Sequence, residues 1–292
     1  MSKRLNVNRR PRNPNAKHLR ISPLFLMWKY PRMVAWFLVT VVIIVLVRLP
    51  FIHTQIIPYY VDFNPGIVLV PIVGVFLGPA GVWGCFVASF VGDSLMGMWG
   101  PMSIFRGIGY FLFALSAKRL WDAYPSGAAR GYAPVWRATF RFILFAWPGC
   151  LIAAAWSALG AEILDLYPFV YVFFLQLMNH LLFVTILGVA LYRIFARDFA
   201  PYFGTWRSYL AKDVMILPLS CYGVILLVIG SLGACLAGLS IGRFVYGISL
   251  FQALTPGKSM FLGTASGVAV IAGVAPFMGL QLLGLFRRRK KG

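Results

Sequence analysis

Residues 62–121 read DFNPGIVLVPIVGVFLGPAGVWGCFVASFVGDSLMGMWGPMSIFRGIGYFLFALSAKRLW. Apolar residues dominate this stretch, but glycine or proline interrupts it every few positions. It also carries Asp62, Asn64, Asp93 and Arg106 in or beside segments that otherwise have the composition of lipid-embedded helices. A charge at bilayer depth is costly and is usually paired or placed in a water-filled cavity. The stretch therefore predicts an integral membrane protein with a polar site near one membrane face.

The composition of the whole chain excludes an ordinary soluble protein. Of the 292 residues, 60% are hydrophobic and 12% are charged, whereas soluble domains usually have about 25% charged residues. The formal net charge is +20, which in a soluble protein would suggest nucleic acid as a partner. Here the basic residues form clusters between apolar runs, so we expect the lipid bilayer with its anionic headgroups, and no nucleic acid.

The apolar runs predict an all-α integral membrane protein, a polytopic bundle of about eight transmembrane helices. A helix crosses a bilayer with about 20 apolar residues. The expected helices are 33–51, 66–77, 80–91, 103–121, 138–160, 168–194, 214–237 and 260–286. The second and third are short, and we expect the fifth to break at residues 147–149. The chain divides into a basic arm with an interfacial segment (1–32), a six-helix membrane core (33–195), two additional transmembrane helices (196–286) and a basic tail (287–292).

The distribution of basic residues predicts the orientation of these helices. With eight crossings, all but four of the 27 basic residues fall on one side of the membrane, the exceptions being Arg48, Arg106, Arg243 and Lys258. Cytoplasmic loops are enriched in lysine and arginine. We therefore expect a multi-pass protein of the cell inner (plasma) membrane with both termini in the cytoplasm, and Asp62, Asp93, Glu162 and Asp165 on the outer side.

The first candidate binding site is the outer-face cluster of Asp62, Asn64, Asp93 and Arg106. The backbone N–H groups after Pro65 suit a ligand carboxylate, because they open a helix. The alternative is structural: Asp93 and Arg106 form a salt bridge across the turn between their helices. Arg48 lies near the end of the first helix, and we expect its side chain to reach outward to the membrane surface.

The second candidate is a set of polar residues in the sixth helix, Gln176, Asn179 and His180. Spacings of three and four residues place them on one helix face, near the middle of the membrane. They form either the floor of a ligand pocket or interhelical hydrogen bonds that hold the bundle together. Neither His18 nor His53 has a metal-ligand spacing with His180, so we expect no metal and no cofactor. The sequence contains no catalytic constellation, and we expect no enzymatic activity.

Part of the chain resembles a known membrane module. The features are a short helix leading into FLGPAG (76–81), the pair Gly92-Asp93, and a glycine-containing helix ending in KRLW (118–121). They are similar to the substrate-binding (S) components of energy-coupling-factor vitamin transporters and to MASE1-like bacterial sensor domains. The resemblance implies a six-helix core that binds a small molecule from the outer face without catalysis.

Two hypotheses about function follow. The first is a non-catalytic protein that binds or takes up a small polar molecule from the outer face. The second is a structural or assembly subunit of a larger membrane complex, or a membrane sensor module. In the second case, the basic N-terminal arm and the Gly-rich eighth helix would contact other membrane subunits.

Overall fold

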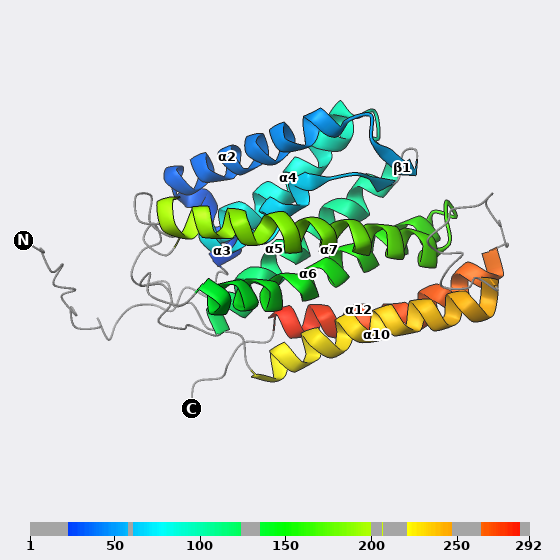
Figure 1. Cartoon of the computed structure of the whole chain (residues 1–292). Helices are drawn as coiled ribbons and strands as arrows, with labels where there is room; N and C mark the ends of the chain where they lie inside the picture. The colour runs from blue at the N-terminus through cyan, green and yellow to red at the C-terminus, as the bar shows by residue number, and fades with distance from the viewer. Residues whose placement is uncertain are drawn as a thin grey trace, which may run out of the picture.

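The computed structural model describes residues 23–57, 61–123, 135–199, 206, 221–246 and 264–286. These residues form a bundle of helices with one small two-stranded sheet at one end (Figure 1). The basic arm, the basic tail and the loop at 124–134 lie outside the described residues, as do most of residues 200–220 and the connection at 247–263. Expectations about those segments therefore stay predictions.

The helices are mostly those that the sequence predicts. Their bounds are α1 Pro23–Leu26, α2 Pro31–Arg48, α3 Leu69–Phe76, α4 Pro79–Leu95, α5 Pro101–Ala123, α6 Val135–Ile163, α7 Phe169–Ile194, α10 Cys221–Tyr246 and α12 Thr264–Phe286. Short 3-10 turns at Met27–Lys29, Leu49–Phe51 and Pro65–Val68, and a π turn at Phe195–Phe199, extend them. Strands β1 (Gln55–Ile57) and β2 (Val61–Asp62) pair in antiparallel fashion.

Five helices in the described part of the chain are long and apolar enough to cross a membrane. They lie at Pro31–Phe51, Thr139–Ile163, Phe169–Phe199, Tyr222–Phe244 and Val268–Phe286. Their outward faces are apolar, as on α2, where Leu38, Val42 and Leu46 are each more than half exposed. Such surfaces suit lipid, since they would be unfavourable in water. The expectation of a multi-pass, predominantly helical membrane protein is confirmed in this form.

Helices α3 and α4 form a tight hairpin within residues 62–121. The eight residues of α3 are all buried, and this helix is too short to cross a bilayer. Gly78 makes the turn with a φ of 58°, a conformation that glycine adopts without steric cost. Beyond the turn, Gly81 packs directly on the carbonyl oxygen of Val73. The predicted short helix before Gly78 and the predicted turn at Gly78-Pro79 are therefore present, and glycine lets the hairpin close. Helix α4 is longer than predicted, with 17 residues.

Three predicted boundaries are wrong. Helix α6 is continuous through Pro148, because a proline removes one backbone hydrogen bond and neighbouring membrane helices support the rest. Helix α4 runs past Asp93 to Leu95, so this carboxylate belongs to the last turn of the helix. Helix α10 continues beyond residue 237 to Tyr246, where Gly238 and Gly242 let it pack directly on Phe169 and Val170 of α7.

The two ends of the bundle differ in charge. Helices α2 and α6 begin at one end, where α5 and α7 finish. There Arg193 donates a hydrogen bond to the Thr139 hydroxyl, and the Arg141 guanidinium stacks over the Trp121 ring. We call this the basic end, since it carries most basic residues of the described ranges and only two acidic ones, Asp122 and Asp198. Its basic residues are Lys29, Arg32, Lys118, Arg119, Arg137, Arg141, Arg193 and Arg197. The opposite end carries Arg48, Arg106 and Arg243 with Asp62, Asp93, Glu162 and Asp165.

Candidate functional site

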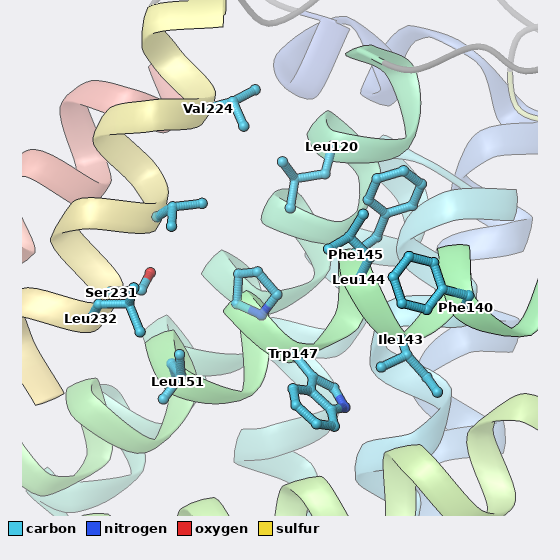
Figure 2. Close-up of a pocket in the computed structure, with 12 residues that line it drawn as sticks. Leu120, Phe140, Ile143, Leu144, Phe145, Trp147, Leu151, Val224, Ser231 and Leu232 are labelled. Atoms are coloured by element: carbon cyan, nitrogen blue, oxygen red, sulfur yellow. The ribbon is translucent and has the colours of Figure 1, made fainter.

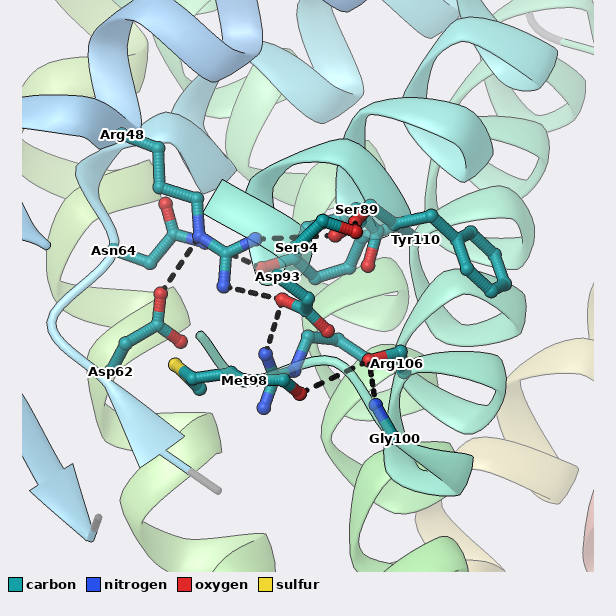
Figure 3. A network of polar contacts seen from close by, with 12 residues as sticks. Arg48, Asp62, Asn64, Ser89, Asp93, Ser94, Met98, Gly100, Arg106 and Tyr110 are labelled. Atoms are coloured by element: carbon teal, nitrogen blue, oxygen red, sulfur yellow. Dashed lines mark hydrogen bonds and ion pairs between the residues drawn. The ribbon is translucent and has the colours of Figure 1, made fainter. Parts of the chain in front are cut away.

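Four charged side chains meet inside the bundle opposite the basic end, and we call them the ionic network (Figure 3). Arg48 Nε lies 2.9 Å from Asp62 Oδ2, and Arg48 Nη2 lies 2.7 Å from Asp93 Oδ1. Arg106 Nη1 lies 2.5 Å from the same Asp93 oxygen. None of the four residues is more than 2% exposed. Two arginines and two aspartates therefore form a neutral cluster closed off from solvent.

Each member of the ionic network comes from the end of a different element. Arg48 is the last residue of α2, Asp62 ends β2, Asp93 lies in the last turn of α4, and Arg106 in the second turn of α5. Gly92 makes room for this meeting, because a Cβ there would stand 2.5 Å from Arg48 Nη1. The end of strand β2 and the ends of three helices thus meet at one point.

The side chain of Arg48 corrects one expectation. Instead of reaching outward to the membrane surface, it turns inward and is 1% exposed. There it donates charge-assisted hydrogen bonds to two buried carboxylates. Such bonds are stronger than those between neutral groups. The salt bridge expected between Asp93 and Arg106 is present, but it is one part of a larger cluster.

Electrostatics keeps the carboxylate of Asp62 ionised. Burial by itself raises the pKa of a carboxyl, but the nearby guanidinium groups of Arg48 and Arg106 outweigh it and hold the pKa of Asp62 below its ordinary value. Removing one partner of a buried ion pair typically costs about 3–5 kcal/mol, since a charge is left buried and uncompensated. The ionic network is therefore stable only while its positive and negative charges balance.

A layer of neutral polar side chains continues the ionic network toward the middle of the bundle. Asn64 Nδ2 donates to the Tyr110 hydroxyl over 2.7 Å, and Asn179 Nδ2 donates to the backbone carbonyl of Asp62 over 2.9 Å. The rings of Tyr110 and His180 meet edge to face at 6.3 Å. We call Asn64, Tyr110, Asn179 and His180 the neutral layer. His180 lies 11 residues after the start of α7 at Phe169, about 16 Å along the helix.

The two candidate clusters of the sequence analysis are therefore one site. Asn179 and His180 on α7 join Asp62, Asn64, Asp93 and Arg106 through direct contacts or through Tyr110. Gln176 is buried one turn earlier on α7, but no hydrogen bond connects it to the ionic network or the neutral layer. Tyr110 was not predicted, although its position four residues after Arg106 places both side chains on one face of α5.

Several buried polar atoms of this site make no hydrogen bond with a described residue. They are Asp93 Oδ2, Asn64 Oδ1, Asn179 Oδ1, Ser89 Oγ and both ring nitrogens of His180. The carbonyl of Cys150 lies beside the imidazole, but without the geometry of a hydrogen bond. A buried polar group without a partner costs about 1–3 kcal/mol. The site thus retains hydrogen-bonding capacity that the described side chains do not use.

The arrangement is one of binding groups. Among the described residues, no group of three His, Cys, Asp or Glu side chains lies close enough to hold a metal ion. The unused atoms include three acceptor oxygens, a hydroxyl and an imidazole. The oxygens can accept hydrogen bonds from a polar molecule, and the hydroxyl and the imidazole can both donate and accept them.

Comparison of the chain with models of known protein families, with curated proteins and with solved structures finds no match. The site must therefore be interpreted from its own geometry.

Proposed function

We propose that the protein is a non-catalytic membrane component that binds or takes up a small polar molecule from the outer face. The ligand site is the neutral layer together with the ionic network beside it. One observation carries the proposal: in a bundle where polar groups are scarce, several buried hydrogen-bonding atoms of this site remain unused.

A purely structural network would be expected to satisfy its own members. Most buried side-chain polar atoms in proteins have a partner, and a partly satisfied network is costly at low dielectric. Here the hydrogen bonds of Asn64 and Asn179 use the amide nitrogens and leave the amide oxygens unused. A bound polar molecule with N–H or O–H groups would use these oxygens and recover the cost.

The proposed orientation places the site near the outer surface. We propose eight crossings with both termini in the cytoplasm, since cytoplasmic segments are enriched in basic residues and the described basic residues concentrate at the end opposite the site. Strand β2, which carries Asp62, and the turn between α4 and α5, where Ser103 Oγ donates to the Met98 carbonyl, lie at this end of the bundle (Figure 3). A ligand would enter when these segments move apart. Binding would then shift the population toward the conformation that holds the ligand.

The resemblance of residues 64–121 to S components of vitamin transporters supports the same proposal. This resemblance implies a core that binds its substrate from outside and depends on partner subunits for energy. A structural or sensor role is the second candidate. In that case the Gly-rich helix α12 would contact a partner subunit, but its Gly284 packs against the backbone of α10 at Leu227 in the same chain.

Thermal unfolding of the purified protein in detergent separates these candidates. The probes are a panel of vitamin-like and amino-acid-like compounds, each compared with the protein alone. A ligand concentration of 100 times the dissociation constant stabilises the folded state by about 2.7 kcal/mol. This raises the unfolding temperature by a readily measured amount. No rise across the panel, together with stable co-purification of other membrane subunits from native membrane, would favour the structural role.

A further inference from the structure

A cavity lies at the other side of the bundle, away from the ionic network. It has a volume of about 610 Å³ and lies between α10, α5 and α6. Figure 2 shows its two walls, with Val224, Ser231 and Leu232 on α10 facing Leu120, Phe145 and Leu151. We call it the α6–α10 groove.

The lining of the α6–α10 groove is almost entirely apolar. Ser231 is the one hydroxyl among its twelve lining residues, and this hydroxyl already donates to the backbone carbonyl of Leu227 over 2.7 Å. The α6 wall extends from Phe140 to Leu151, about 16 Å along the helix. An elongated apolar cavity with no unused polar group suits a hydrocarbon chain and does not suit a polar solute.

One mouth of the groove lies at the basic end. Leu120 near the end of α5, Phe140 near the start of α6 and Val224 near the start of α10 line this mouth. One turn before Phe140 and Leu144, the same helix carries Arg137 and Arg141. The Arg141 guanidinium lies 5.3 Å from the ring centre of Phe145, which lines the groove, and Arg137 is exposed next to the ring of Trp136. Tryptophan and arginine at a helix start are typical of the headgroup region.

We propose that the α6–α10 groove binds the acyl chain of an anionic phospholipid, whose phosphate group contacts Arg137 and Arg141. Charge complementarity selects this occupant: the groove supplies an apolar channel, and the excess of basic over acidic side chains at its mouth attracts a phosphate. The site is separate from the ionic network and does not depend on the proposed function.

The test uses the full chain, purified in detergent, with native mass spectrometry to count bound lipids. The probes are phosphatidylglycerol and phosphatidylcholine with identical acyl chains, which differ in headgroup charge. We expect the wild-type protein to bind phosphatidylglycerol on the order of tenfold more tightly. Equal retention of both lipids would mean a non-specific lipid shell and would overturn the proposal.

Variants at the two parts of the site give different results. The double variant Arg137→Gln/Arg141→Gln should bind both lipids with equal, weaker affinity. Val228→Trp on α10 and, independently, Leu144→Trp on α6 should fill the groove and lower the affinity for both lipids by tenfold or more. Two variants on opposite walls are used so that the failure of one to fold does not decide the outcome.

The matched controls are Arg243→Gln and Leu236→Trp, which change an exposed arginine and an exposed leucine of α10 outside the groove. Both should bind lipid as the wild type does. The proposal is wrong if the groove-filling variants retain wild-type selectivity. It is equally wrong if Val228→Trp converts a dimer into a monomer without changing lipid binding, because the occupant would then be a second copy of the chain.

Discussion

Nη2 of Arg48 lies 2.7 Å from Oδ1 of Asp93, a residue 45 positions later in the chain. This contact connects the end of α2 to the end of α4. It joins the Arg48–Asp62 ion pair and the Arg106–Asp93 ion pair into one cluster. Both side chains are about 1% exposed, so no water shields their charges. The charge balance of the ionic network therefore governs its stability.

Removing Asp93 alone should be severe, whereas removing a balanced pair should not. Asp93→Leu leaves two guanidinium groups facing one carboxylate, and we expect a loss of about 3–5 kcal/mol. Asp93→Leu/Arg106→Met keeps the Arg48–Asp62 pair balanced and should recover most of that loss, because apolar residues often replace a buried ion pair at little cost.

The measurement is the free energy of unfolding in mixed detergent, with Ser94→Ala, an exposed position on the same turn of α4, as the control. If the double variant were as unstable as the single one, charge balance would not be what holds the network.

The lowered pKa of Asp62 predicts how stability depends on pH. Its folded-state pKa lies below the ordinary aspartate value, which is about 3.9. The stabilisation from this carboxylate is therefore fully present above that value and is lost as the pH falls through the folded-state pKa. The gap in unfolding temperature between the wild type and Asp62→Asn should stay constant from pH 8 to pH 5 and narrow only in more acidic buffer.

The matched control for this titration is Asp165→Asn at an exposed turn, which should show no such gap. A gap that closed near pH 6 would contradict the ion pairing of Asp62.

Close packing of α3 against α5 makes Gly74 sensitive to substitution. A Cβ at this position would lie 2.5 Å from the backbone carbonyl oxygen of Ala114. Gly74→Ala should therefore destabilise the protein by about 1–3 kcal/mol, as overpacking does. The control is Gly279→Ala on α12, where no described atom lies within 4 Å of the added Cβ.

Since alanine has less conformational freedom to lose than glycine, Gly279→Ala should stabilise the protein by about 0.5–1 kcal/mol. Thermal unfolding of both variants gives the comparison, and equal effects would mean that α3 and α5 are not in close contact.

Labelling of single cysteines tests the proposed orientation. In a protein whose native cysteines are replaced, Gly100→Cys lies at the turn next to the ionic network and Ala196→Cys lies at the basic end. A membrane-impermeant maleimide should label Gly100→Cys on intact cells and Ala196→Cys only after permeabilisation. The reverse pattern would place the ionic network in the cytoplasm and would end the proposal of an outer-face site.

The sequence predicts the helical membrane class well, because long apolar runs have few alternatives in lipid. It also predicts the short α3 from the spacing of Pro65, Gly78 and Pro79. These features depend on local residues. Where the chain departs from the prediction, as at Pro148 in α6, support from neighbouring helices outweighs the local preference.

The site is less predictable, since its contacts join residues far apart in the chain. The individual members Asp62, Asn64, Asp93, Arg106, Asn179 and His180 stand out because polar groups are rare in apolar helices. Their union into a single site depends on Asn179 reaching the backbone of Asp62 across 117 positions, which no local pattern encodes. The inward turn of Arg48 is equally hidden, because a helix-end arginine usually reaches toward water.

The most direct test of the central claim is the ligand response of the variant His180→Leu. His180 is fully buried with both ring nitrogens unused among the described residues, so an apolar side chain of similar size should leave the free protein as stable as the wild type, or more stable. If the neutral layer binds a ligand, the compound that raises the unfolding temperature of the wild type will no longer do so for His180→Leu, while the control Met178→Leu on the exposed face of α7 will respond normally. A wild-type response in His180→Leu, or a loss of stability without ligand, would contradict a binding role for the buried polar layer.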